Sequence, residues 1–266
     1  MRIEAISAVV RFGDTLALDR VDCAVRAGEM VGLIGPNGAG KTTLMRVLAG
    51  LQPLQSGEAL YDGRRARDFP RRELARRVAF LAQEGEAYWP LRVDRLVALG
   101  RLPHRRAFFG ESAADGAAVE AALAAADVAH LRARTLRALS GGERARVLLA
   151  RALAVEAEML LADEPVAALD PLHQLGAMAL LRSVARNGAG VVAVLHDLTL
   201  AARFCDRLIV LAGGRVLADG PPGVLTDAVL AAAYGVEAVR GEHGGEPFIV
   251  PWRASARSPG ASETGA

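Results

Sequence analysis

Hydrophobic and polar residues alternate over residues 2–10 and again over 21–26, the pattern of strands that bury only one face. Gly13 and Asp14, between the two segments, mark a turn. The chain is therefore predicted to open with a β-rich unit.

Short apolar runs and helical segments then take turns along the chain. The runs predicted to form buried strands cover residues 30–34, 78–82, 159–162, 191–195 and 208–211. Helical periodicity covers residues 41–49, 175–185 and 199–204. Such alternation is typical of a parallel sheet covered by helices, so an α/β fold is expected.

Two further segments differ from this alternation. From residue 93 to about 138 the chain is rich in alanine, leucine and arginine at helical spacing, interrupted by Pro103 and Gly110. This stretch is predicted to be an inserted helical subdomain. From Pro251 onward no apolar periodicity remains, and a flexible tail is predicted there.

Composition and charge exclude several classes of protein. A net charge of +2 over 266 residues gives no general field to hold nucleic acid. No apolar run reaches the ~18 residues that cross a bilayer, and residues 1–4 lack the basic head of a secretory signal. A soluble chain is expected. Cys23 and Cys205 lie in apolar segments without metal-ligand spacing, which predicts reduced core thiols.

A phosphate-binding loop is the clearest chemical signal. Residues 35–42 read GPNGAGKT and lie between a predicted strand and a predicted helix. Backbone N–H groups of such a loop cradle phosphate oxygens, while Lys41 would contact the β and γ phosphates and Thr42 would bind Mg²⁺. Lys41 is the only lysine among 32 basic residues. A glycine-rich turn without ligand is the alternative.

Two carboxylates follow the apolar run at 159–162. Asp163 and Glu164 would emerge beside the phosphate loop if the two strands are neighbours in the sheet. There Asp163 would hold Mg²⁺ and Glu164 would polarise an attacking water. Taken alone, two acids at this place could also cap a helix.

Residues 139–143, LSGGE, precede another helical segment. Ser140 and Glu143 have the spacing of a capping box. Gly141 and Gly142 are not needed for a cap and weaken a first turn. Paired glycines are explained if the backbone must approach a second anion closely at this helix N-terminus.

These motifs and their order resemble those of an ATP-binding-cassette (ABC) ATPase, over about residues 1–250. The resemblance implies a P-loop NTPase fold: a RecA-like parallel sheet, an antiparallel β subdomain and an inserted α-helical subdomain. It implies a nucleotide-binding core over residues 1–86 and 155–250, a helical subdomain over about 87–154, and a tail over 251–266. In that family two copies associate head to tail, so that each ATP lies between one phosphate loop and the partner's LSGGE signature.

Further positions are carried over from the resemblance. Phe12 matches the aromatic that stacks on adenine, with a core phenylalanine as the alternative, and Gln83 matches the glutamine that senses Mg²⁺ and water. Asp170 matches the D-loop, and His196 matches the switch histidine. The implied catalytic residues are Lys41, Gln83, Glu164 and His196, and the implied Mg²⁺ ligands are Thr42, Gln83 and Asp163. The implied ATP contacts are Phe12, Gly35, Pro36, Asn37, Gly38, Ala39, Gly40, Lys41, Thr42, Thr43, Ser140, Gly141, Gly142, Glu143 and Asp170.

Three segments, at 97–104, 196–203 and 225–236, resemble ATPases that serve iron-siderophore, haem and cobalamin importers. Siderophore import is the leading interpretation, with haem or cobalamin as alternatives, then another ABC transporter. Residues 42–138 leave too little chain for the coiled-coil arm of an ABC protein that acts on nucleic acid, so no nucleic-acid partner is expected.

The resemblance also implies partners. They are a second copy of the chain, membrane permease subunits and, indirectly, a periplasmic or extracellular solute-binding protein, with the chain at the cytoplasmic face of the inner membrane. The loop at 84–90 carries Tyr88 and Trp89, which suit a socket for a permease helix. The alternative is that Trp89 packs the helical subdomain onto the core.

Overall fold

The strand β3 (Met30–Ile34) is buried along its whole length near the centre of the larger sheet. The computed structural model describes residues 1–83, 91–105 and 112–255. Met30 and Ile34 pack into one hydrophobic core, and Val31 and Leu33 pack into another on the opposite face. Both faces of the sheet are therefore covered, as a mainly parallel sheet requires.

The larger sheet has the strand order β10-β9-β3-β8-β7-β6, and every neighbouring pair is parallel except β9 and β10. Its other strands are β6 (Val78–Leu81), β7 (Met159–Ala162), β8 (Gly190–Val194), β9 (Arg207–Ala212) and β10 (Arg215–Gly220). The apolar runs predict the five parallel strands to within one residue at each end. β10 escapes prediction because none of its residues is fully buried.

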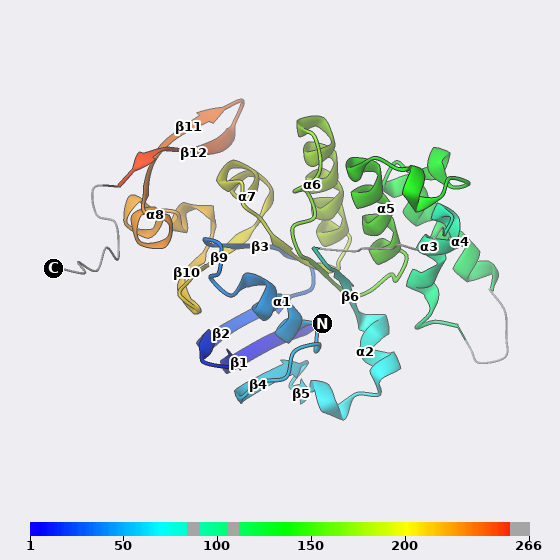
Figure 1. Ribbon diagram of the computed structural model, residues 1–266, viewed down its shortest axis with the longest axis horizontal. Coiled ribbons are helices and arrows are strands. Elements are labelled where there is room, and N and C mark those ends of the chain that lie inside the picture. Colours follow the sequence, from blue (N-terminus) through cyan, green and yellow to red (C-terminus); the bar gives the residue numbers. More distant parts are fainter. Residues whose placement is uncertain (84–90, 106–111, 256–266) are drawn as a thin grey trace.

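A second, antiparallel sheet has the order β2-β1-β4-β5. Its strands are β1 (Arg2–Phe12), β2 (Thr15–Arg26), β4 (Ser56–Tyr61) and β5 (Arg64–Arg65). The predicted opening hairpin with its turn at Gly13 and Asp14 is confirmed, although both strands are longer than the alternation indicates. In Figure 1 this sheet lies below the larger one, with α1 (Lys41–Leu48) between them.

The opposite face of the larger sheet is covered by α6 (Pro171–Arg186) and α7 (Leu198–Phe204), which lie above it in Figure 1. Met178 and Leu181 of α6 and Ala201 of α7 are fully buried in that core. The layered arrangement confirms the expected α/β fold with an antiparallel β subdomain.

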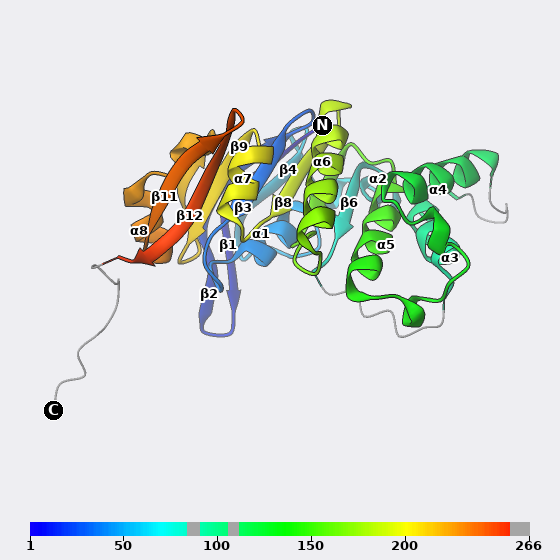
Figure 2. The same cartoon turned by 90° about the horizontal axis from the view of Figure 1, so that it is seen from above.

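Helices between β6 and β7 form a separate group beside the sheet (Figure 2). They are α3 (Val93–Ala98), η2 (Leu99–Arg101), α4 (Ala113–Ala125), η3 (Ala129–Leu131), η4 (Leu136–Ala138) and α5 (Gly141–Leu153). The helical character predicted for this stretch is confirmed. The exact boundaries of a helical subdomain stay a prediction.

The remaining elements connect or follow the sheets. The segment η1 (Ala66–Asp68) and α2 (Arg71–Arg77) lead into β6. After β10 come η5 (Pro222–Val224), α8 (Asp227–Tyr234), β11 (Val236–His243) and β12 (Glu246–Ala254). No helix in the described part of the chain is long and apolar enough to span a membrane.

The C-terminal prediction is wrong for its first residues. Instead of starting a tail, Pro251 to Ala254 end β12, which pairs with β11. The strand is held against α7, since the Thr199 hydroxyl donates to the carbonyl of Ile249 and accepts from its N–H. Only residues 256–266 of the predicted tail lie outside the described residues.

Candidate nucleotide-binding site

The phosphate loop joins β3 to α1 in a conformation that demands glycine. Gly35 has φ +149°, and a Cβ there would lie 2.1 Å from the carbonyl oxygen of Leu211. Gly40 has φ +98°, and a Cβ there would lie 2.4 Å from the carbonyl oxygen of Ala17. The loop is thus pressed against β9 and β2, which fixes the direction of its backbone.

Lys41 is the first residue of α1, and only 7% of it is exposed. Its ammonium donates hydrogen bonds to the carbonyl oxygens of Gly35, at 2.7 Å, and Pro36, at 2.8 Å. Burial lowers the pKa of Lys41, and the carboxylates of Glu164 and Asp163 oppose that shift. Lys41 therefore lies within electrostatic reach of both acids that follow β7.

Asp163 is 1% exposed, and neither of its carboxylate oxygens has a hydrogen-bond partner among the described residues. Burial raises the pKa of Asp163, and the nearby Thr42 hydroxyl opposes the rise. A buried carboxylate with two unpartnered oxygens beside a hydroxyl is the donor set of a hard divalent cation. The residues present therefore fit Mg²⁺.

Glu164 follows with φ +54°, in the left-handed region that a non-glycine residue rarely adopts. Its Oε1 lies 2.6 Å from Nε2 of His196. His196 comes two residues after β8, and Glu164 comes two residues after β7, so neighbouring strands deliver the pair to the same edge of the sheet.

The strand carrying the phosphate loop and the strand carrying the carboxylates are not neighbours. Asp163 and Glu164 are expected beside the phosphate loop if their strand is next to β3. The two strands are not neighbours, because β8 lies between β3 and β7. Lys41 and Asp163 nevertheless lie close enough for the charge of Lys41 to lower the pKa of Asp163. The extra strand supplies His196, which contacts Glu164.

Two further residues carried over from the resemblance, Gln83 and Phe12, lie at or just after the ends of strands. Gln83 is exposed and comes two residues after β6, whose Leu81 pairs with Ala162 of β7, so it ends at the same edge as Glu164. Phe12 is 50% exposed at the end of β1, next to the turn. The alternative of a core phenylalanine is therefore wrong for Phe12.

The signature residues form the N-terminus of α5. Ser140 is the N-cap: its hydroxyl accepts from the N–H of Glu143 at 3.2 Å, and the Glu143 carboxylate accepts from the N–H of Ser140 at 2.8 Å. The predicted capping box is confirmed. A Cβ on Gly141 would meet nothing within 4 Å, and one on Gly142 would make only ordinary contacts. Packing within the chain does not explain either glycine.

Asp170 is the N-cap of α6 and accepts from the N–H of His173 at 3.0 Å. This bond is the main cause of the lowered pKa of Asp170. A cavity of about 390 Å³ brings Asp170 and His173 together with Ser140, Gly142 and Glu143. Within the described residues, no hydrogen bond or ion pair joins this group to Lys41, Asp163 or Glu164.

Tyr234 of α8 lies near the phosphate loop, and no motif in the sequence indicates that position. Burial raises the pKa of Tyr234 to about 12, and the backbone N–H of Gly35 opposes the rise. A residue of α8 thus faces the first glycine of the phosphate loop, almost 200 positions earlier in the chain. The proposed socket residues Tyr88 and Trp89 lie outside the described residues.

The comparisons with known proteins agree with this geometry. A family model described as ABC transporter matches residues 18–167. The hemin import ATP-binding protein HmuV of Pseudomonas fluorescens is 43% identical over 258 residues, which cover 94% of this chain and 99% of the relative. HmuV of Streptomyces coelicolor is 45% identical over 248 residues, which cover 92% and 88%. This chain belongs to the ABC transporter family.

Solved ABC transporter structures share its fold. A dimeric bacterial ABC transporter cassette matches with a TM-score of 0.74 and 28% identity, over 83% of this chain and 98% of that one. A metal-chelate type ABC transporter in an inward-facing conformation matches with a TM-score of 0.80 over 94% and 97%, and at 23% identity it speaks for the fold alone. As an ATP-binding cassette of this family, the chain is an ATPase of an ABC importer.

Proposed function

We propose that this chain hydrolyses ATP to drive hemin uptake through a separate membrane permease. The support is that relatives named hemin import ATP-binding protein match nearly its whole length, with 41–49% identity. The sequence interpretation ranks siderophore import first and haem import as an alternative. The names of the relatives favour the haem alternative.

The observation that carries the catalytic proposal is the pairing of Glu164 with His196 beside the buried Asp163. In this proposal Lys41 and the loop amides hold the phosphates of ATP, while Thr42 and Asp163 hold Mg²⁺. The metal neutralises phosphate charge when bound. Glu164 orients the attacking water and accepts its proton, and His196 fixes the Glu164 side chain by hydrogen bonding.

The strained backbone of Glu164 supports this role. A left-handed φ costs on the order of 1–3 kcal/mol, and such strain persists where the surrounding structure fixes it. Here the N–H of Asp163 donates to the carbonyl oxygen of Leu81 at 2.8 Å, so the strand pairing with β6 continues up to the strained residue. The backbone turn directs Glu164 toward His196 while Asp163 stays buried.

A second copy is proposed to complete each site. Gly141 costs helix stability, and its missing Cβ faces open space in this chain. That combination is explained if a phosphate group held by another copy approaches the backbone of Ser140, Gly141 and Gly142. Phe12 would stack on adenine, and Gln83 would respond to the bound Mg²⁺ and water.

The proposed cellular location and partners are those of an ABC importer. The chain would lie at the cytoplasmic face of the inner membrane, attached through permease subunits that receive solute from an extracytoplasmic binding protein. Haem is the proposed cargo, and no nucleic acid is involved. The loop containing Tyr88 and Trp89 stays the proposed contact for the permease.

Uptake measurements test the cargo. The gene is deleted, and the strain is complemented with wild-type protein or with Glu164→Gln. We expect growth on hemin as the only iron source to need the wild-type protein, while growth on ferric siderophore is unchanged. Loss of siderophore-dependent growth with normal growth on hemin would favour the siderophore interpretation instead.

A further inference from the structure

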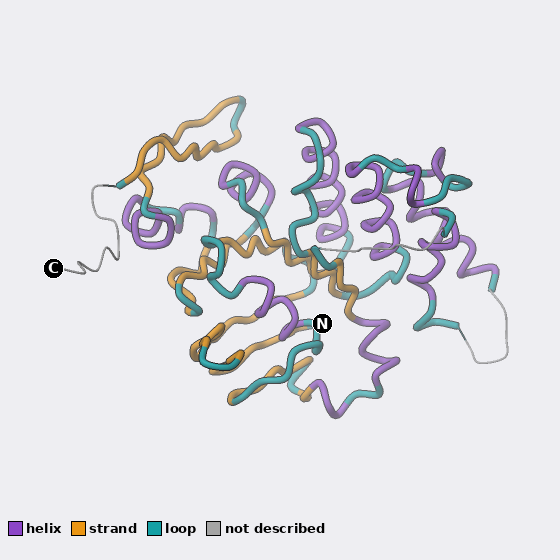
Figure 3. Tube along the Cα trace, in the orientation of Figure 1, coloured by secondary structure: helices purple, strands orange, loops and turns teal. Residues whose placement is uncertain are grey.

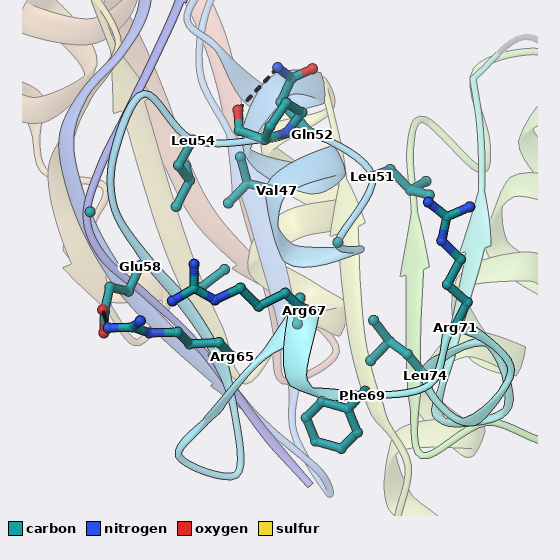
Figure 4. Close-up of a pocket in the computed structure, with 15 residues that line it drawn as sticks. Val47, Leu51, Gln52, Leu54, Glu58, Arg65, Arg67, Phe69, Arg71 and Leu74 are labelled. Carbon is teal, nitrogen blue, oxygen red and sulfur yellow. Dashed lines mark hydrogen bonds and ion pairs between the residues drawn. The ribbon is translucent and has the colours of Figure 1, made fainter.

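A cleft of about 710 Å³ lies at the end of α1 opposite the phosphate loop. It is bordered by the C-terminal end of α1, the loop at 50–54, β4, η1 and the start of α2 (Figure 4). None of its lining residues belongs to the proposed nucleotide site. The catalytic assignment therefore leaves the cleft without a function.

The lining of the cleft combines polar side chains, Glu58 among them, with a group of apolar ones. Val47 is 1% exposed and Phe69 is 6% exposed, and Leu54 and Leu74 are half-buried beside them. Leu51 also lines the cleft, but 62% of it is exposed. Leu51 thus extends the apolar part of the cleft out to the solvent.

Positive charge surrounds this surface. Residues 64–77 contain seven arginines and only two acids, in a chain whose net charge is +2. Several of these arginines are engaged: Arg65 pairs with Glu58, Arg77 pairs with Glu158, and Arg64 stacks over Phe69 at 4.1 Å. Arg72 and Arg76 both donate to the carbonyl oxygen of Pro103.

Arg67 and Arg71 are different. Both are exposed, and no hydrogen bond or ion pair of either side chain occurs within residues 1–83, 91–105 and 112–255. In Figure 4 Arg67 extends across the cleft toward Leu54 and Val47, and Arg71 reaches toward Leu51. Two guanidinium groups without a partner among the described residues thus border the cleft from two sides.

We propose that this cleft binds the phosphate headgroup of an anionic phospholipid. Guanidinium groups bind phosphate oxygens through two parallel hydrogen bonds, which suits Arg67 and Arg71. The glycerol and first acyl carbons would lie against Leu51, Leu54 and Leu74. The basic residues continue beyond the cleft along 64–77, and a broad basic surface of this kind suits an anionic membrane better than a single acidic peptide.

The proposed lipid site would have the same role whichever solute is transported. The test measures co-sedimentation of the full chain with vesicles of phosphatidylcholine alone, or of phosphatidylcholine mixed with phosphatidylglycerol. We expect binding only to the mixed vesicles. Each basic residue near an anionic surface contributes about fivefold in affinity, so the double variant Arg67→Gln, Arg71→Gln should bind about 25-fold more weakly.

Arg186→Gln is the matched control. Arg186 is exposed near the end of α6, away from the cleft, and no described partner engages it, so the substitution removes one positive charge elsewhere, as the single variant Arg67→Gln does at the cleft. It should bind mixed vesicles as the wild-type chain does. A second variant, Leu51→Gln, tests the apolar contact and should weaken vesicle binding without changing charge.

Three results would overturn the proposal. One is an equal loss of binding in Arg186→Gln and in the single variant Arg67→Gln, which would mean that only net charge matters. Another is thermal stabilisation by inorganic phosphate that needs Arg67 and Arg71 while vesicles do not bind, which would assign the cleft to a free anion. The third is unchanged vesicle binding with lost permease co-purification, which would assign it to a protein partner.

ATP turnover is measured on the same preparations. Vesicle binding that is lost while turnover is unchanged supports the lipid site and leaves the import proposal unaffected. Absent turnover in the wild-type chain would count against the proposed function without altering the vesicle result.

Discussion

Nε2 of His196 and Oε1 of Glu164 are 2.6 Å apart, although the two residues lie 32 positions apart in the chain. The contact exists because β7 and β8 pair in parallel and end at the same edge of the sheet. The contact fixes the direction of the Glu164 carboxylate. A fixed side chain loses little further entropy when it has to orient water.

Replacing Glu164 by glutamine should stop ATP hydrolysis while preserving ATP binding. The amide keeps the shape and can still hydrogen-bond to His196, but it cannot accept a proton. We expect turnover to fall about 10²–10⁴-fold. Because unhydrolysed ATP should keep two copies together, gel filtration with Mg-ATP should show a dimer. A persistent monomer would argue against the shared site.

Lys41→Arg should abolish nucleotide binding or turnover, even though arginine takes the place of lysine everywhere else in the chain. The Lys41 ammonium fits between two carbonyl oxygens of the loop, and a planar guanidinium needs more room. Nucleotide affinity and turnover are both measured. Near-normal hydrolysis would show that this space tolerates the larger group.

Gly141→Ala should separate folding from function. Its Cβ would meet nothing within 4 Å and its φ is not left-handed, so alanine should stabilise the first turn of α5 by roughly 0.5–1 kcal/mol. Turnover should nevertheless fall if a partner's phosphate must approach this backbone. Melting temperature and ATPase activity are read together.

Gly116→Ala is the control for that experiment, because Gly116 lies within α4 and also has open space at its Cβ. It should raise the melting temperature to a similar degree and leave turnover unchanged. If Gly141→Ala retains full activity, the glycine has no role in approach by a partner.

Asp163→Asn should stabilise the nucleotide-free protein near neutral pH and abolish Mg²⁺-dependent ATP binding. Burial raises the pKa of Asp163 from its ordinary 3.8, so the folded state favours the protonated form. Wild-type stability therefore falls as pH rises through the window between 3.8 and the raised pKa, and the deficit persists above it.

Melting temperatures of the Asp163→Asn variant and the wild type, measured over a pH series without Mg²⁺, check this sign. The difference should shrink as the pH is lowered through that window. A difference that is independent of pH would mean that the asparagine acts through packing rather than through charge.

The sequence predicts the parallel strands well because each is a run of buried apolar residues with few competing patterns. It also predicts the residues around the phosphates, because loop chemistry demands glycine, lysine and a hydroxyl at fixed spacing. The order of strands is different: no local pattern shows that β8 separates β3 from β7. That order depends on how the helices pack over the sheet.

The C-terminal error has a similar cause. Pro251 and the small residues after it lack periodicity, so local pattern predicts a tail. The strand forms because β12 pairs with β11, and Thr199 on α7, a distant segment, hydrogen-bonds to both backbone groups of Ile249. The sequence indicates Asp163 as a Mg²⁺ ligand, but it does not show that both carboxylate oxygens are buried without a hydrogen-bond partner among the described residues, because that depends on burial by neighbouring elements.

The strand order also determines how late in synthesis the phosphate loop can reach its native conformation. The phosphate loop is synthesised within the first 42 residues, but the neighbours of its strand, β8 and β9, are made only from residue 190 onward. Until then β3 has two unpaired edges, and the carbonyl of Leu211 that confines Gly35 does not yet exist. A nascent chain stalled before β8 carries the complete loop sequence with its contact to β2 but without those to β8 and β9, and nucleotide is not expected to assist its folding until most of the chain has been translated.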